Sequence, residues 1–134
     1  SSDYKKGGGF EYVGSIMPIE RYPECYRRGR EISERHDIPY TVTGRIVGVG
    51  HSMMFAWTYA FNRADPGSMR EAREALHETD DLVIELGGVI WKPGTYGQQL
   101  IIERLDPGTR ALMRRIKEVL DPEGIMNPGN WEGV

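Results

Sequence analysis

The stretch Ser52–Phe61 reads SMMFAWTYAF and shows the clearest alternation of large and small side chains in the sequence. The large side chains stand at odd-numbered positions, and mostly smaller ones stand at even-numbered positions. Because successive side chains of a β-strand point to opposite faces of the sheet, this period of two predicts a strand with two buried or half-buried faces. The period does not decide whether the odd-numbered aromatic residues form a core under helices or an uncovered surface.

The segments around this stretch predict three further strands and two helices. They are the strand Phe10–Ile19, an amphipathic helix from Tyr22, the strand Tyr40–Val47, a helix from Asp65-Pro66 to Gly87-Gly88, and the strand Val89–Lys92. The resulting order, β-α-β-β-α-β, predicts an α+β fold, a ferredoxin-like split βαβ sandwich with both helices on one sheet face. The other face then needs something to cover it.

A third helix is expected to start at Asp106-Pro107 and to stop before Asp121-Pro122. Its apolar period predicts a buried face made of Leu112, Met113, Ile116, Val119 and Leu120. We therefore expect a linker at residues 1–9, a ferredoxin-like domain at residues 10–104, and a C-terminal helix and tail at residues 105–134. The linker has no initiator Met and no apolar signal core, so we expect another segment to precede it.

The composition is that of a soluble globular domain. The chain has 134 residues, of which 28% are charged, and a mean hydropathy of −0.51. No apolar run approaches the roughly 18 residues that a membrane span needs. A net charge of −3 argues against a nucleic-acid partner, and the arginines of residues 21–35 alternate with glutamates, which predicts a solvated helix face. The lone Cys25 excludes an intrachain disulfide and fits a reducing, cytoplasmic location.

The tail Leu120–Gly129 reads LDPEGIMNPG. Together with the helix before it, this stretch resembles the C-terminal signature of FAD-linked oxidases of the vanillyl-alcohol oxidase / p-cresol methylhydroxylase superfamily, which includes D-lactate and glycolate dehydrogenases. The resemblance extends over about residues 10–130. It implies a substrate-binding cap domain whose open sheet face covers the isoalloxazine ring of FAD, while a separate domain or subunit binds most of the FAD. A hydride would pass from an alcohol, alkylphenol or hydroxy-acid carbon to flavin N5.

One branch of this superfamily oxidises 2-hydroxy acids with imidazoles around a divalent metal. Gly50-His51 matches the first imidazole position of that pattern. The second imidazole position is Thr58, and Pro93-Gly94 stands where a Glu-His pair would fall. Because one imidazole without partners is a poor transition-metal site, we predict no metal.

The phenol-oxidising branch carries an aromatic-cation pair that stabilises the substrate anion, and Trp91-Lys92 occupies those positions here. The resemblance implies that Lys92 holds the anionic form of the substrate, which eases loss of the hydride. Lys92 could instead be a strand-end lysine that extends into water. Arg45 is a candidate for binding a substrate carboxylate, with an ordinary exposed strand arginine as the alternative.

The same branch has a His-His pair near the flavin, and Met54-Phe55 stands at those positions here. His51, three residues earlier, either substitutes for that pair or is an ordinary loop histidine. Tyr12 lies on the first strand, where some members attach the flavin covalently, so it is either a flavin anchor or a plain strand tyrosine.

Two further segments carry candidate residues. Tyr96 and Gln98, with Gln99, are expected in a loop after Lys92, where they would line the substrate or form ordinary surface. Asn127 is the tail residue expected to touch flavin or substrate, and its alternative role is to form a turn before Pro128.

A second function class is a stand-alone ferredoxin-like binding or regulatory subunit, because the sequence shows no nucleophile-base pairing. A third is one chain of a split oxidase paired with a flavin-binding chain, and a homo-oligomer is compatible with any of these. The coding sequence upstream of Ser1 would separate the classes, since a Gly-rich pyrophosphate loop there indicates the enzyme.

Overall fold

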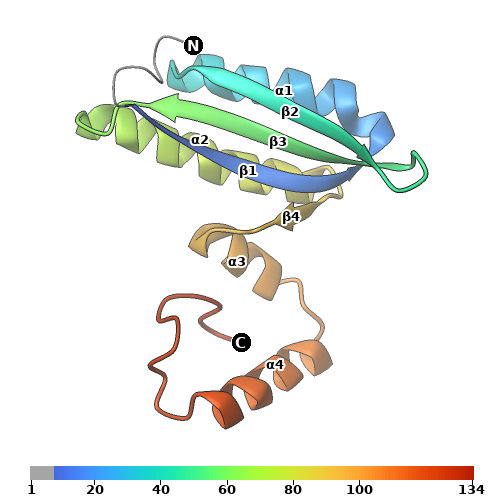
Figure 1. Ribbon diagram of the computed structural model, residues 1–134, viewed down its shortest axis with the longest axis vertical. Coiled ribbons are helices and arrows are strands. Elements are labelled where there is room, and N and C mark those ends of the chain that lie inside the picture. Colours follow the sequence, from blue (N-terminus) through green and yellow to red (C-terminus); the bar gives the residue numbers. More distant parts are fainter. Residues whose placement is uncertain (1–7) are drawn as a thin grey trace. The chain divides into compact units, whose positions relative to one another are not determined.

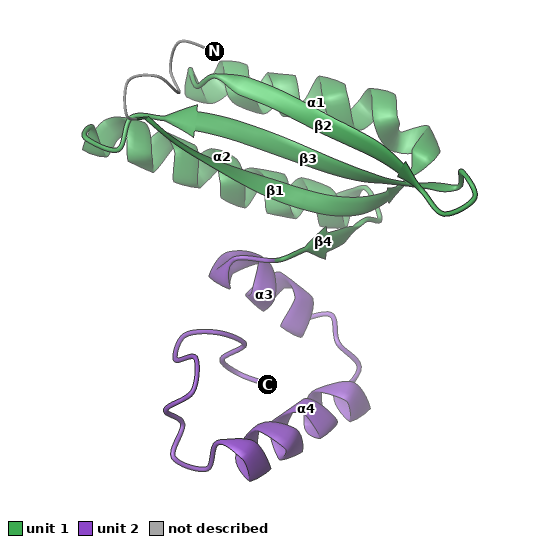
Figure 2. Ribbon diagram, in the orientation of Figure 1, with its two compact units in different colours: residues 1–92 green, residues 93–134 purple. Residues whose placement is uncertain are grey.

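The computed structural model of the chain describes residues 8–134. Most of the linker expected at residues 1–9 lies outside the described residues, and Gly9 already belongs to the first strand. The chain forms two compact units that divide after Lys92 (Figure 2). This division comes before the boundary expected at residue 104, because the segment after Lys92 packs with the tail.

The first unit is a four-stranded sheet with two helices (Figure 1). Its elements are β1 (Gly9–Pro18), a 3-10 turn η2 (Ile19–Arg21), α1 (Tyr22–His36), β2 (Tyr40–Val47), β3 (Ser52–Phe61), α2 (Pro66–Glu85) and β4 (Val89–Trp91). The strand order is β2-β3-β1-β4, and every neighbouring pair is antiparallel. In Figure 1 both helices lie behind the sheet, so the viewer faces its uncovered side. The predicted ferredoxin-like fold is confirmed.

Local signals account for the helix ends. Asp65 caps α2 by accepting a 2.9 Å hydrogen bond from the backbone N–H of Gly67, and Pro66 takes the first helical position. The helix α1 ends at Asp37, which adopts the left-handed conformation with φ of 48°. The start of α2 depends on residues close in sequence, which is why the sequence predicts it.

The odd-numbered side chains of β3 form the core under the helices. Phe55, Trp57 and Tyr59 have no solvent-exposed surface. The indole N–H of Trp57 donates a 2.9 Å hydrogen bond to the carbonyl of Cys25 on α1, and the Tyr59 hydroxyl lies 2.7 Å from the hydroxyl of Thr79 on α2. The core therefore attaches each helix to the same strand through one aromatic residue with a polar group.

Gly29 lets α1 approach the sheet closely. A Cβ atom at this position would lie 2.3 Å from Cδ1 of Trp57 and 2.3 Å from the hydroxyl of Tyr40. Both distances are far below van der Waals contact, and both neighbours are large rings in a packed region. Only glycine fits between this helix and this sheet.

We therefore expect Gly29→Ala to lower the free energy of unfolding by about 1–3 kcal/mol, since the added methyl overpacks the core. Urea unfolding followed by circular dichroism measures this change. The control is Gly44→Ala on β2, where the nearest atom to an added Cβ, Cε2 of Tyr22, lies at 3.5 Å. Equal stability losses in the two variants would contradict the packing argument.

Ion pairs cover the outer surface of the two helices. Arg27 pairs with Glu31 at 2.6 Å, and Arg30 pairs with Glu34 at 2.8 Å, each one helical turn apart. Arg28 reaches across to Glu85 on α2 with two hydrogen bonds of 3.0 Å. The arginine-rich segment is thus a helix face neutralised by glutamates, as the alternation of charges predicts.

His36 lies between two carboxylates where α1 meets α2. Its Nδ1 is 2.9 Å from Glu71 and its Nε2 is 3.1 Å from Glu78, which also pairs with Arg35. Partial burial opposes the charged imidazole, but the hydrogen bonds that His36 donates to Glu71 and Glu78 outweigh it and raise the pKa of His36 above its ordinary value. Two carboxylate partners require that both ring nitrogens donate, which only the protonated ring can do.

This contact should contribute stability that is complete below the unfolded-state pKa of about 6.5 and is lost as pH rises through the higher folded-state pKa. The difference in free energy of unfolding between the parent chain and His36→Gln should therefore be larger at about pH 6 than at about pH 9. Urea titrations at the two pH values measure it. Glu78→Gln should reduce the pH-dependent part of that difference, and a pH-independent difference would contradict this assignment.

The second unit contains α3 (Thr95–Ile102), α4 (Pro107–Leu120) and the tail, residues 121–134. The segment around Tyr96 and Gln98, expected as a loop, is the helix α3. The expected burial of the apolar face of α4 is not observed, because Leu112, Ile116, Val119 and Leu120 are between 50% and 79% exposed. Within residues 8–134, no helix combines the length and apolar character needed to cross a bilayer.

Candidate functional site

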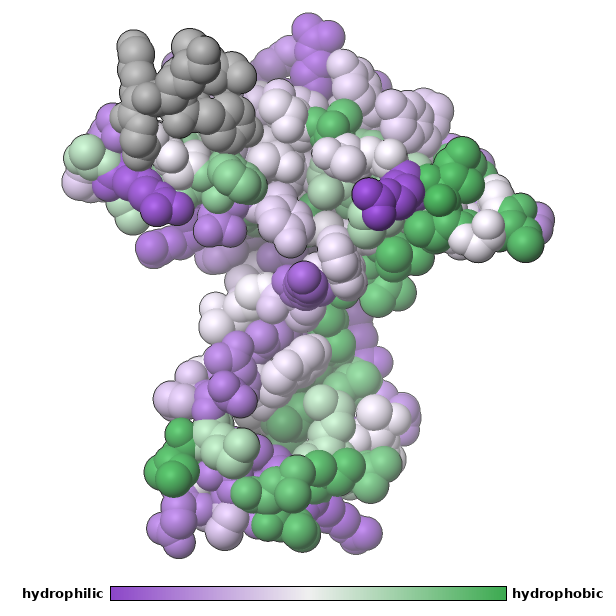
Figure 3. Space-filling model, viewed as in Figure 1, coloured by the Kyte–Doolittle hydropathy of each residue, from purple (hydrophilic) through white to green (hydrophobic). Residues whose placement is uncertain are grey.

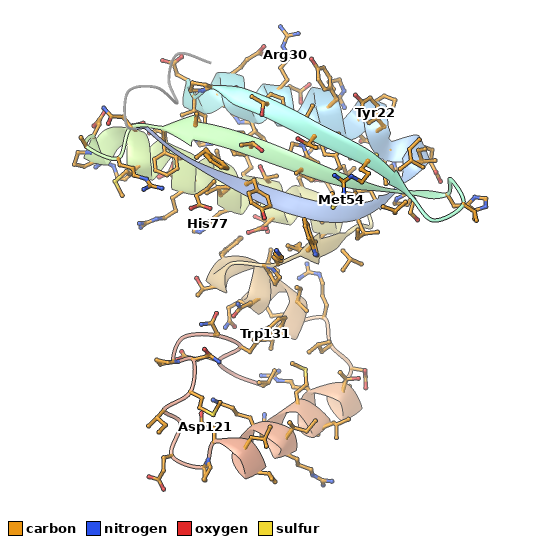
Figure 4. The ribbon with its side chains drawn as sticks, in the orientation of Figure 1. Tyr22, Arg30, Met54, His77, Asp121 and Trp131 are labelled. Carbon is orange, nitrogen blue, oxygen red and sulfur yellow. The ribbon has the colours of Figure 1, made fainter. Side chains whose placement is uncertain are left out.

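The uncovered face of the sheet in the first unit, called the open face below, is built from the residues that point away from the helices. It consists of Phe10, Tyr12, Gly14, Ile16, Pro18, Thr41, Thr43, Arg45, Val47, Ser52, Met54, Ala56, Thr58, Ala60, Val89 and Trp91. Figure 4 labels Met54 on this face. The strand register therefore brings four predicted site residues, Tyr12, Arg45, Met54 and Trp91, onto one surface.

Two aromatic side chains occupy one edge of the open face. Trp91 on β4 is paired with Gly14 on β1, and Tyr12 lies two residues before Gly14 on the same face. Trp91 remains 38% exposed and Tyr12 remains 40% exposed, so both rings present apolar surface to the outside. Gly14 itself is buried, which places it beneath these rings. Sequence reasoning did not select Gly14, because its role arises only from pairing with β4.

Lys92 follows Trp91 and folds back over it. Its Nζ lies 4.9 Å from the centre of the Trp91 ring, a cation-π distance. Its backbone adopts the left-handed region, with φ of 56°, so the chain leaves the strand at this residue. The aromatic-cation pair predicted from the sequence is therefore a contact in the structure.

Arg45 is the only charged side chain among the open-face positions, and it stands on the opposite edge strand. It is exposed and pairs in register with Met54 on β3. The open face thus has one cation at each edge, with apolar and hydroxyl-bearing side chains between them. Such a surface suits a ligand that combines a flat apolar part with a negative group.

Phe55 and His51 do not share this surface. Phe55 is fully buried on the helix-covered face, with its ring centre 4.6 Å from that of Trp57 and 5.7 Å from that of Tyr22. Neighbours in a strand point to opposite faces, so the expected flavin contact at Met54-Phe55 can involve Met54 but not Phe55. His51 lies in the exposed turn between β2 and β3, where its carbonyl accepts a hydrogen bond from the N–H of Ile19.

In the second unit, Gln98 ties α3 to the tail. Its side-chain amide donates to Asn130 Oδ1 at 3.0 Å and to the Pro93 carbonyl at 3.2 Å, while its oxygen accepts from the N–H of Trp131 at 2.7 Å. The residue is only 5% exposed. The polar atoms of Gln98 are thus used within the unit, and its role in lining the substrate stays a prediction. Tyr96 lies on the same helix, partly exposed.

Asp121 organises the turn that begins the tail. Its carboxylate accepts hydrogen bonds from the backbone N–H groups of Ile125 at 2.9 Å and Met126 at 3.0 Å, and from Lys117. Lys117 also donates to the Met126 carbonyl at 2.8 Å. The bond from Lys117 and those from the two backbone groups lower the pKa of Asp121 below its ordinary value, although burial opposes this. The Asp-Pro-Glu-Gly part of the signature is therefore a carboxylate-centred turn.

Asn127 follows this turn in the left-handed conformation, with φ of 50°. It is exposed and borders a hollow of about 570 Å³ formed by α4 and the tail, with Ile116, Leu120 and Trp131 among its lining residues. Figure 3 shows hydrophobic residues gathered along α4 and the tail, and Figure 4 labels Asp121 and Trp131 within this unit. The hollow is mainly apolar.

Asp121→Ala should release the turn, because three donors lose their acceptor while α4 itself remains capped by Asp106. We expect faster hydrogen exchange at the amides of Ile125 and Met126, measured by NMR or mass spectrometry. Glu123→Ala, which removes an exposed carboxylate from the same turn, is the matched control. Unchanged protection in Asp121→Ala would show that the carboxylate does not hold the turn.

Among the described residues, one group has side chains spaced to hold a metal ion, namely His36, Glu71 and Glu74. It lies on the helices and not on the open face. That the substrate site holds no metal therefore stays a prediction.

A family model described as "FAD linked oxidases, C-terminal domain" matches residues 11–131, which include most of β1, the other three strands of the sheet and the tail signature. The chain belongs to this family. The resemblance inferred from the tail is thereby confirmed.

Three similar proteins illustrate the range of the family. An FAD-linked oxidoreductase of Mycobacterium tuberculosis is 29% identical over 125 residues, covering 91% of this chain and 25% of the relative. A D-lactate dehydrogenase of Archaeoglobus fulgidus is 31% identical, covering 89% and 26%. The structure of 4-ethylphenol oxidase from Gulosibacter chungangensis with isoeugenol superposes with a TM-score of 0.80 at 25% identity, covering 96% and 25%. The chain thus spans about a quarter of the length of these relatives.

The open face fits the ring part of FAD. The exposed apolar groups of Tyr12, Ile16 and Trp91 suit contact with a planar heterocycle. Within residues 8–134, no strand-to-helix connection is a glycine-rich loop of the pyrophosphate-binding kind. The residues present on the open face therefore suit contact with the flavin ring.

Proposed function

We propose that the first unit forms the substrate-facing wall of an FAD-dependent oxidoreductase that passes a hydride from an alcohol, alkylphenol or hydroxy-acid carbon to flavin N5. The observation that carries the proposal is the open face itself, an uncovered sheet surface with exposed aromatic rings and a lysine at one edge. Membership of the family of FAD-linked oxidase C-terminal domains supports FAD as the cofactor and oxidation as the class of reaction. FAD, when bound, accepts the hydride.

The residues of the open face bind and orient the substrate in this proposal. Trp91 and Tyr12 offer apolar surface against which the substrate packs. Lys92 stabilises negative charge on a phenolate or carboxylate and so favours the form that loses hydride more readily. Arg45 offers a bidentate partner to a carboxylate at the other edge. Met54, between these edges, contributes an adaptable apolar contact to flavin or substrate.

The second unit has a different role, which is to join this domain to the FAD-binding domain. The exposed apolar face of α4, together with Ile125 at 77% and Met126 at 53% exposure, is the surface proposed to make that contact. Asn127 projects from the same segment and is the tail residue proposed to reach flavin or substrate. His51, Tyr96 and a covalent flavin bond at Tyr12 remain predictions from the resemblance.

The intact polypeptide or complex that contains this chain, purified without denaturation, tests the function directly. It should show flavin absorbance, and anaerobic addition of an oxidisable substrate should bleach that absorbance. 4-Ethylphenol and D-lactate are the first probes, since similar proteins are named for them. A preparation without flavin would overturn the proposal and favour a binding or regulatory module.

Lys92→Ala should lower kcat/KM for the accepted probe on the order of 10²-fold, the lower end of what loss of one charge-stabilising donor costs in an active site. The reason is that the anionic substrate loses the cation held above Trp91. Steady-state kinetics of the intact enzyme measure the effect. Lys92→Arg keeps the charge and should retain most of the activity, and unchanged turnover in Lys92→Ala would remove Lys92 from the mechanism.

A further inference from the structure

We propose that Gly14 is a positioning residue that lays Trp91 against the sheet, and that the resulting surface selects a substrate with a planar aromatic ring. The inference rests on the proposed function and deepens it, because it names the substrate class of the open face. It depends on the strand register, which pairs Gly14 with Trp91, and on the limited space around Gly14.

The register places a row of small side chains next to Trp91. Trp91 pairs with Gly14, Gly14 pairs with Ala56, and Ala56 pairs with Thr43. One neighbouring row across the sheet contains Tyr12, and the row on the other side contains Ile16, Met54 and Arg45. This row of small side chains starts at the Trp91 indole and has larger side chains on both sides. Such a surface suits a flat group that lies on the sheet.

Gly14 makes this arrangement possible. An added Cβ would lie 3.0 Å from Cε3 of Trp91, and 3.5 Å from both Cε2 of Tyr12 and the Trp91 carbonyl. The first distance is tighter than ordinary carbon contacts, so the indole would have to move. The backbone carbonyl belongs to a paired strand and cannot retreat easily, whereas the ring can swing outward. A side chain at position 14 therefore lifts Trp91 away from the sheet and disturbs its contact with Lys92.

The consequence differs between substrate classes. An alkylphenol has a ring that can stack against the half-exposed Trp91 and Tyr12 and lie over the small side chain of Ala56. A short 2-hydroxy acid has no such ring, and its binding relies on charge. Displacing Trp91 should therefore weaken binding of an aromatic substrate far more than binding of an aliphatic one, and the structure favours the aromatic class.

The test is Gly14→Ala in the intact flavin-containing protein, with 4-ethylphenol and D-lactate as probes. We expect KM for 4-ethylphenol to rise about five- to tenfold, in line with the loss of one aromatic stacking contact. Gly44→Ala, a glycine of the same sheet with room for a methyl group, should leave KM unchanged. In a Trp91→Ala background, adding Gly14→Ala should cause no further rise, because the two changes act through the same ring.

Several results would overturn the inference. They are an unchanged KM in Gly14→Ala, an equal further rise in the Trp91→Ala background, or a wild-type protein that turns over D-lactate but does not bind 4-ethylphenol. If Gly14→Ala does not fold, Trp91→Ala alone should still raise KM for 4-ethylphenol, and no rise would reject the aromatic surface.

A binding measurement separates this inference from the proposed function. If the protein is isolated without flavin, the proposed function fails, but 4-ethylphenol binding can still be followed by the quenching of Trp91 fluorescence. The Trp91 fluorescence is the part of the signal that is lost in Trp91→Phe. Quenching that is retained in Gly44→Ala and weakened in Gly14→Ala supports the inference. Equal quenching in all three proteins overturns it.

Discussion

The contact between Trp57 and Gly29 is the constraint on which the first unit depends. The indole occupies the space that a side chain on α1 would fill, and its N–H satisfies the Cys25 carbonyl one turn earlier on that helix. This fixes α1 on the face of the sheet where the odd-numbered residues of β3 point. Because α2 is held on the same face through Thr79 and Tyr59, neither helix of the first unit covers the other face. The open face is therefore a consequence of how the core is packed.

The sequence predicts the fold well where the signals are local. The alternation in Ser52–Phe61 and the Asp-Pro starts of α2 and α4 act over a few residues, and the structure has these elements at nearly the expected bounds. The side of the sheet that the helices cover could not be predicted, since a period of two is the same for either face. The helix α3 was missed because no side chain caps it and Gly94 and Gly97 read as a loop.

The candidate site shows the same limit. Trp91 and Lys92 are adjacent in sequence, so their pairing was visible, but the nearness of Trp91 to Tyr12 required the β1–β4 register. Phe55 was included because Met54-Phe55 stands at the positions of the His-His pair in the resemblance, yet neighbours in a strand point to opposite faces, so only Met54 lies on the open face. The partners of Gln98 were equally out of reach, since its hydrogen bonds to Asn130 and Trp131 join residues more than 30 positions apart in the sequence.

The second unit buries a carboxylate and exposes apolar side chains, which is the reverse of the usual arrangement in a folded domain. Asp121 is 6% exposed while Ile125, which it holds by a backbone hydrogen bond, is 77% exposed. A self-contained unit would bury the isoleucine and expose the carboxylate, since each Å² of apolar surface removed from water contributes about 25 cal/mol. The hydrogen bonds of the buried Asp121 carboxylate therefore order the segment Ile125-Met126, whose apolar side chains are exposed. Such order is useful when a second surface receives those side chains, and relatives four times as long contain the additional chain that the proposed FAD-binding domain requires.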